Sequence, residues 1–240
     1  MIDYILGALA RSEGGWLLTP NVEILRQVDR DGELRALAER ATVSVADGAP
    51  VEWAARLAGH PLPARVTGSG LIWSLSAAAA QAGRSVFLLG GNAGVADRAA
   101  VALTARSPAL KVVGTHCPPR GFEADPAASA AILAALAEAH PVIVFWGLGF
   151  PKQEHLIDRL VGRFPRSWFI CCGAAITFAG GEVPRAPVWM QRVGLEWLFR
   201  LATEPRRLAG QYLLHDLPYA IRLLARAALD GRRRRRAATV

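Results

Sequence analysis

Val142–Ile157 reads VIVFWGLGFPKQEHLI, and this stretch decides the fold class. It begins with a continuous apolar run rich in β-branched and aromatic residues, which is typical of a strand buried on both faces of a parallel sheet. Gly147 and Gly149 then interrupt the run, and Pro151 is suited to the first turn of a helix. The stretch therefore predicts a strand–loop–helix unit, and ligands of open α/β sheets bind at the carboxyl ends of such strands.

The helix predicted after Pro151 would begin with Lys152, Gln153 and Glu154. A helix N-terminus with a lysine and backbone N–H groups is suited to an anion such as a phosphate. However, the spacing Gly-x-Gly-x-x-Lys matches neither the dinucleotide-binding fingerprint nor the P-loop. From the glycines alone, an ordinary strand–loop–helix connection is the preferred interpretation.

Further strands and helices are predicted on both sides of this unit. Short apolar runs predict strands at residues 16–18, 42–45, 86–89, 111–114 and 168–172. Helical spacing predicts helices at residues 2–10, 22–28, 71–82 and 127–139, with others around Trp53 and before Arg106. This alternation predicts an α/β fold with a mostly parallel, Rossmann-like sheet that carries helices on both faces. We assign residues 1–189 to this catalytic domain.

The character of the chain changes after Pro187. Trp189–Leu201 predicts a single amphipathic, aromatic helix, and Leu217–Leu229 predicts another with interleaved arginines. Residues 190–231 are therefore predicted to form an amphipathic helical appendage, followed by a basic tail at residues 232–240. Apolar and aromatic side chains beside positive charge are typical of helices that lie in a membrane interface. Completion of the core or a dimer contact is the alternative.

Composition narrows the class of protein. The chain has 240 residues, of which 52% are hydrophobic, so it is long enough for a large core and is globular rather than disordered. Its net charge of +8 favours an anionic partner, either a nucleotide, a nucleic acid or a membrane surface. Cys117, Cys171 and Cys172 show neither a CxxC spacing nor a disulfide framework, which indicates a reducing compartment. We expect neither a signal peptide nor a membrane-spanning helix.

Polar residues follow three of the predicted strands, at the edge where such a sheet places its active site. These residues are Thr19, Asp47 and Gln153. The Asp47 carboxylate can serve as a general base, although a purely structural role as a helix N-cap or turn aspartate is the alternative. Arg65 can bind a diphosphate through two parallel hydrogen bonds, and a solvated arginine is its alternative.

The other motifs are weaker evidence for a phosphate or metal site. The Gly90–Gly94 turn can receive a phosphate on its N–H groups, but tight packing between strand and helix explains it equally well. Asp29-Arg30-Asp31 matches the Asp-x-Asp pattern with which many glycosyltransferases hold a divalent metal. We reject it, because it lies at a charged helix end, and the five histidines lack ligand spacing. We therefore expect no metal and no cofactor.

Taken together, several segments resemble the WecG/TagA/CpsF family of bacterial glycosyltransferases from Leu17 to about Tyr212. They are TPNVEIL at 19–25, ADG at 46–48, WAARLAG at 53–59, RVTGSGL at 65–71, VFLLGGNAGVADRA at 86–99, GLGFPKQE at 147–154 and RAPVWMQRVGLEWLFRLATEPRRL at 185–208. The resemblance implies an inverting, metal-independent transferase that moves N-acetylmannosamine or a related hexose from a UDP-sugar. The implied acceptor is a saccharide on undecaprenyl diphosphate, used in teichoic acid, capsule or exopolysaccharide assembly.

The resemblance also assigns roles to residues. Asp47 matches the proposed catalytic base, and Thr19, Arg65 and Gln153 match residues that line the sugar and diphosphate site. The candidate substrate-binding residues are Asn21, Gly149, Lys152, Arg206 and Arg207. The implied partners are the UDP-sugar, the lipid-linked acceptor and an anionic membrane surface, with a second copy of the chain as a further candidate and nucleic acid excluded. The implied location is cytoplasmic, at the inner face of the cytoplasmic membrane.

Two other functions fit parts of the sequence. A Rossmann-type oxidoreductase would explain the sheet, but the glycine fingerprint is incomplete. A non-catalytic module that binds nucleic acid or a membrane would explain Arg232–Arg236, but this run is short and terminal. Salt-sensitive RNA binding that is lost with the run would support the second alternative.

Overall fold

The computed structural model describes residues 1–63 and 65–237, except the side chains of Arg192, Arg207, Arg236 and Ala237. The chain divides into two compact units. The sheet unit comprises Met1–Thr19, Glu33–Ser44 and Gly68–Pro184. The helical unit comprises Pro20–Gly32, Val45–Thr67 and Arg185–Val240.

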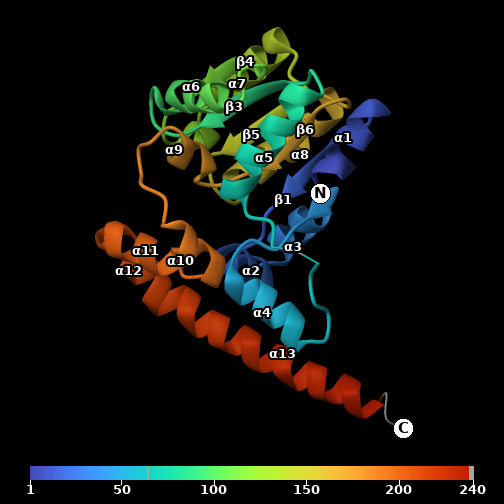
Figure 1. The fold of residues 1–240 in the computed structure, drawn as a ribbon, viewed down its shortest axis with the longest axis vertical. Helices are drawn as coiled ribbons and strands as arrows, with labels where there is room; N and C mark the ends of the chain where they lie inside the picture. The colour runs from blue at the N-terminus through green and yellow to red at the C-terminus, as the bar shows by residue number, and fades with distance from the viewer. Residues whose placement is uncertain (64, 238–240) are drawn as a thin grey trace. The chain divides into compact units, whose positions relative to one another are not determined.

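The sheet has six strands, all parallel, in the order β2-β1-β6-β5-β3-β4. Figure 1 labels β1, β3, β4, β5 and β6. The strands are β1 (Gly15–Leu18), β2 (Val43–Ser44), β3 (Ser85–Gly90), β4 (Lys111–His116), β5 (Ile143–Gly147) and β6 (Trp168–Cys171). Each lies close to its sequence-predicted position. The prediction of an α/β fold with a parallel sheet is confirmed.

The connections of the sheet diverge between β3 and β5. From β3 the chain continues through α6 (Val95–Arg106) to β4 at one edge, whereas from β5 it continues through α8 (Lys152–Leu160) to β6 on the other side. Ligand crevices of open α/β sheets form at such points. Both strands end in glycine here, and a Cβ atom on Gly90 would lie only 2.6 Å from the carbonyl oxygen of Gly147. Gly90 therefore allows the two strand ends to approach closely. This close packing is the alternative to phosphate binding that the sequence offered for the Gly90–Gly94 turn.

Helices cover both faces of the sheet. On one face, alternate strand residues such as Trp16, Val144 and Phe169 pack against α7 (Pro126–Ala139) and α8 in one apolar cluster. The intervening residues Leu17 and Phe145 are also fully buried. The other elements of this unit are α1 (Ile2–Ala10), α3 (Gly32–Glu39), α5 (Gly68–Gln81), α9 (Ala175–Ala179) and two short 3₁₀ turns at Phe122–Ala124 and Val161–Arg163. Among these, α5 and α9 contact α6 as well as the sheet, so the predicted burial of the central strands on both faces is confirmed.

The helical unit consists of short helices and one long one (Figure 1). Its elements are α2 (Val22–Arg30), α4 (Ala49–Leu57), α10 (Val188–Val193), α11 (Glu196–Thr203), α12 (Pro205–Ala209), a π-helical turn (Gly210–Asp216) and α13 (Leu217–Ala237). No helix in the described part of the chain is long and apolar enough to cross a membrane.

Two sequence predictions about this unit are wrong. The single helix predicted for Trp189–Leu201 is divided into α10 and α11, because Gly194 ends α10 with a left-handed φ of 80°. The last helix does not stop at Leu229 but continues to Ala237 through the arginine run, and arginine is a good helix former. Gly231 lies within this helix where a Cβ atom would be 2.0 Å from the carbonyl oxygen of Leu57, so glycine permits α13 to pack against the end of α4.

Candidate active site

Thr19 connects the carboxyl ends of two neighbouring strands. It directly follows β1, and its buried hydroxyl donates a hydrogen bond of 2.8 Å to the carbonyl oxygen of Cys171 at the end of β6. A hydroxyl has one donor and two lone pairs, so its oxygen can still accept a bond from a ligand. The sequence prediction that Thr19 lies at this edge of the sheet agrees with its observed position.

Gln153 binds the loop that leads from β5 into α8. Its Oε1 atom accepts hydrogen bonds from the backbone N–H groups of Leu148 at 3.0 Å and Gly149 at 3.2 Å. Its side-chain NH₂ group donates to Glu154 Oε1 at 2.8 Å. Gln153 is only 3% exposed, so its clearest role in the structure is to fix the backbone of this loop.

The loop between β5 and α8 leaves space around Gly149. Gly149 has a φ of 87°, a conformation that favours glycine, and no described atom outside its chain neighbours lies within 4 Å of where its Cβ would be. The Phe150–Pro151 peptide bond is cis. Lys152 is half exposed and forms an ion pair with Glu123, which lowers the pKa of that carboxyl through the hydrogen bond between them. The predicted cation at the start of α8 is therefore present, with a carboxylate partner in the same unit.

Sequence reasoning missed the importance of Glu154. A glutamate in the first turn of a helix is usually a solvated residue that complements the helix dipole. In the structure its side chain is fully buried, and burial raises the pKa of its carboxyl. It also contacts the Cys171 thiol, whose pKa is raised by burial and by the nearby carboxyl. The only signal was its position beside buried residues at helical spacing, Gln153, Leu156 and Ile157.

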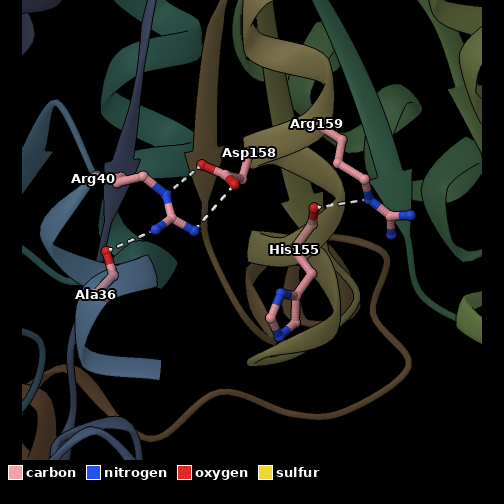
Figure 2. Close-up of polar contacts among 5 residues, drawn as sticks. All are labelled: Ala36, Arg40, His155, Asp158 and Arg159. Carbon is pink, nitrogen blue, oxygen red and sulfur yellow. Dashed lines mark hydrogen bonds and ion pairs between the residues drawn. The ribbon is translucent and has the colours of Figure 1, made fainter. Parts of the chain in front are cut away.

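Ion pairing also attaches the second half of α8 to α3 (Figure 2). Arg40, just after α3, binds both carboxylate oxygens of Asp158 at 2.7 and 3.1 Å and also donates to the Ala36 carbonyl at 3.2 Å. The Arg159 side chain donates to the His155 carbonyl at 3.2 Å, while the His155 ring points away from the Arg40–Asp158 pair. These contacts are solvent-exposed and orient the helix rather than form part of the site.

In the helical unit, Asp47 and Asn21 are brought near each other through Pro20. The backbone N–H of Asp47 donates to the Pro20 carbonyl at 3.0 Å. The helix α4 begins after its N-cap Gly48, which has a φ of 98°, so Asp47 lies one residue before the cap. Asn21 caps α2 by accepting a bond of 2.9 Å from the N–H of Ile24.

Arg65 is half buried and lies against α10. Its guanidinium donates to the Gln191 carbonyl, and a Cβ atom on Gly194 would lie 3.5 Å from it. A guanidinium has five N–H groups, so this contact leaves donors for a phosphate. Arg206 is exposed at the start of α12, whereas the side chain of Arg207 lies outside the described residues.

The candidate residues thus fall into two sets, one in each unit. Thr19, Gly149, Lys152 and Gln153 lie in the sheet unit, and Asn21, Asp47, Arg65 and Arg206 lie in the helical unit. Within the described part of the chain, no group of three or more His, Cys, Asp or Glu residues could hold a metal ion. Asp29 of the rejected Asp-x-Asp motif instead accepts a hydrogen bond of 2.7 Å from the Tyr219 hydroxyl.

Comparisons with known proteins identify relatives of this chain. A family model described as "Glycosyl transferase WecG/TagA/CpsF family" matches residues 1–234. The chain is 30% identical over 199 residues to a protein of Bacillus spizizenii strain W23 named N-acetylglucosaminyldiphosphoundecaprenol N-acetyl-beta-D-mannosaminyltransferase, covering 83% of this chain and 75% of the relative. A protein of the same name from Bacillus subtilis strain 168 is 28% identical over 194 residues, covering 81% of this chain and 73% of the relative.

Proposed function

The chain belongs to the WecG/TagA/CpsF family of glycosyltransferases, and we propose that it transfers N-acetylmannosamine or a related hexose from a UDP-sugar to a saccharide on undecaprenyl diphosphate. The observation that carries this proposal is the extent of the family match, since residues 1–234 include every candidate residue of both units. Two relatives are named for a diphosphoundecaprenol acceptor and an N-acetylmannosaminyl donor group. The product would enter teichoic acid, capsule or exopolysaccharide assembly.

The attacking group in such a reaction is an acceptor hydroxyl, which must lose a proton. We assign this step to the carboxylate of Asp47, which follows β2 and is half buried. A positioned general base typically contributes about 10²–10⁴-fold to the rate. Direct attack in line with the departing group would invert the anomeric carbon.

The departing group is UDP, which leaves with the charge of its diphosphate. Preorganised cations and N–H donors can stabilise that charge without a metal ion. Arg65 suits this task because a guanidinium matches two phosphate oxygens at once. Lys152, Arg206 and Arg207 supply further positive charge, and Thr19, Asn21 and Gly149 supply polar or open backbone positions for the sugar.

We also propose that the helical unit binds the inner face of the cytoplasmic membrane, because the acceptor is a lipid. Large apolar side chains are exposed along α10 to α13, including Trp189 at 61% and Leu214 at 71%. Four arginines, Arg232–Arg235, are exposed at the end of α13. Each arginine near an anionic surface contributes about 1 kcal/mol to binding.

The proposed function is tested by a donor screen. Purified protein is incubated with a short-chain lipid-diphosphate acceptor and a panel of UDP-sugars, and UDP release is measured with and without excess EDTA. The proposal predicts acceptor-dependent release with one UDP-hexose, unchanged by EDTA. If EDTA abolishes UDP release and magnesium restores it, the metal-free mechanism is overturned. If no UDP-sugar gives UDP release, the donor class is overturned.

A further inference from the structure

A carboxyl group is buried directly beneath the loop between β5 and α8. The Glu154 side chain is 0% exposed, although it lies beside the candidate residue Gln153. Among the described residues its Oε2 atom has no partner that meets hydrogen-bond geometry, although the weakly donating Cys171 thiol lies against the carboxyl. Burying a carboxyl with an unpartnered oxygen is unfavourable, so packing alone does not explain a glutamate at this position.

The hydrogen bonds of this group dictate the orientation of the Gln153 amide. Glu154 Oε1 accepts from the amide NH₂ at 2.8 Å, and the amide oxygen accepts from Leu148 and Gly149. If the amide rotated by half a turn, its oxygen would face the carboxyl oxygen and its NH₂ group would face two N–H donors. All three hydrogen bonds would then be lost, so the two backbone N–H groups and the accepting Oε1 atom of Glu154 together select a single orientation.

The same group links this loop to a second strand end. Glu154 contacts the Cys171 thiol, and the backbone carbonyl of Cys171 accepts the hydroxyl of Thr19. A continuous buried path therefore runs from the end of β1 through β6 to the loop after β5. Burial raises the pKa of the Glu154 carboxyl, which favours its neutral form and allows an amide to replace it.

We propose that Glu154 is a positioning residue for sugar transfer: it holds the Gln153 amide in the orientation that fixes the loop backbone at Leu148 and Gly149. This inference rests on the proposed function, because the loop lies at the edge of the sheet where the donor would bind. Glu154 does not touch the substrates. It acts through Gln153 on the backbone that faces them.

Three substitutions separate positioning from a structural role. Glu154→Gln keeps an acceptor at the position of Oε1 and is expected to retain most of the turnover. Glu154→Met fills a similar volume without an acceptor and is expected to lower kcat by about 10- to 100-fold, as misplacement of a site by roughly 1 Å does. Glu154→Asp keeps the carboxyl but withdraws it by one methylene, so it is expected to behave like Glu154→Met.

A double-mutant cycle with Gln153→Ala identifies the route of the effect. If Glu154 acts through Gln153, the Gln153→Ala/Glu154→Met variant loses no more kcat than Gln153→Ala alone. If wild type and the Glu154→Met variant have equal thermal midpoints but unequal kcat, the result supports a positioning role for Glu154. Multiplicative losses in the double variant, or full kcat in both Glu154→Met and Glu154→Asp, would overturn it.

Hydrogen exchange provides a readout that does not depend on activity. The Leu148 and Gly149 amides should exchange faster in Glu154→Met, or in Glu154→Asp if the methionine variant does not fold, and at the wild-type rate in Glu154→Gln. Unchanged exchange in the variants would overturn the inference even if the wild type is active. Conversely, a wild type that transfers no sugar refutes the proposed function, while faster exchange would still support the hold of Glu154 on the loop.

Discussion

Replacing Asp216 by alanine is expected to destabilise the protein by about 3–5 kcal/mol, because it removes the hydrogen-bonded carboxylate of the buried Arg26 guanidinium and leaves as the neighbouring acid Glu23, whose pKa is raised by burial. Asp216 Oδ1 lies 2.9 Å from Arg26 Nε, and the two side chains are only 10% and 13% exposed. Gln211 donates to the other carboxylate oxygen at 3.2 Å. The pair joins the π-helical turn to α2, the helix that begins after Asn21, so its loss should loosen the attachment of the last helices to α2.

The assay is thermal and urea unfolding followed by circular dichroism. In a chain of this size, each kcal/mol shifts the midpoint by about 2–4 °C, so the expected loss is roughly 6–20 °C. The matched control is Asp158→Ala, which breaks the exposed pair with Arg40 and should cost at most about 1 kcal/mol. The Arg26→Met/Asp216→Leu variant should recover most of the stability. If Asp216→Ala loses no more than Asp158→Ala, or the double variant shows no recovery, the reasoning is refuted.

The remaining predictions concern charge, pH and the membrane. Arg65→Ala should weaken UDP binding and lower turnover together, measured by calorimetry and UDP release; unchanged UDP affinity would contradict the proposed contact between Arg65 and the diphosphate. Burial raises the pKa of Glu154 above its ordinary value of 4.5, so the stability that protonation gives is fully present below pH 4.5 and is lost as pH rises through the raised pKa. The unfolding free energy of Glu154→Gln, measured in urea titrations, should therefore rise relative to that of wild type as pH increases from 4.5 through the raised pKa. A difference in unfolding free energy that does not change with pH would contradict the raised pKa of Glu154. Leu213→Ser/Leu214→Ser should reduce flotation with anionic liposomes, whereas Val101→Ser, at an exposed position of the sheet unit, should not; equal flotation would exclude these leucines as anchors.

The sheet could be predicted from sequence because its strands are short, continuous apolar runs. Val142–Trp146 and Trp168–Cys172 contain residues that prefer strands, and glycines mark where they end. The order of the strands and the short helix α9 were not predicted, since both depend on long-range packing. The helix boundaries near Gly194 and Gly231 were wrong for a related reason: one glycine ends a helix, while the other permits close contact with α4.

The candidate site could be predicted in outline but not in its contacts. Thr19 and Gln153 were identified because polar residues at strand ends are informative, and both lie where expected. Glu154 was missed because its one local signal, its position beside Leu156 and Ile157 in α8, is weak and a glutamate in the first turn of a helix is usually solvated. Its burial and its contact with Cys171 of β6 depend on long-range packing of α8 against the sheet.

We propose that this chain transfers a sugar to a lipid-linked saccharide, with Asp47 as the base. The most direct measurement is the transfer of radiolabelled N-acetylmannosamine from its UDP donor to a short-chain lipid-diphosphate N-acetylglucosamine acceptor, by wild type and by Asp47→Asn. We expect acceptor-dependent label in the extracted lipid for wild type, and a kcat about 10²–10⁴-fold lower for Asp47→Asn with UDP binding retained. Asp47→Asn with wild-type kcat would contradict the assignment of the base, and wild type that labels no lipid with this or any other UDP-hexose would contradict the claim itself.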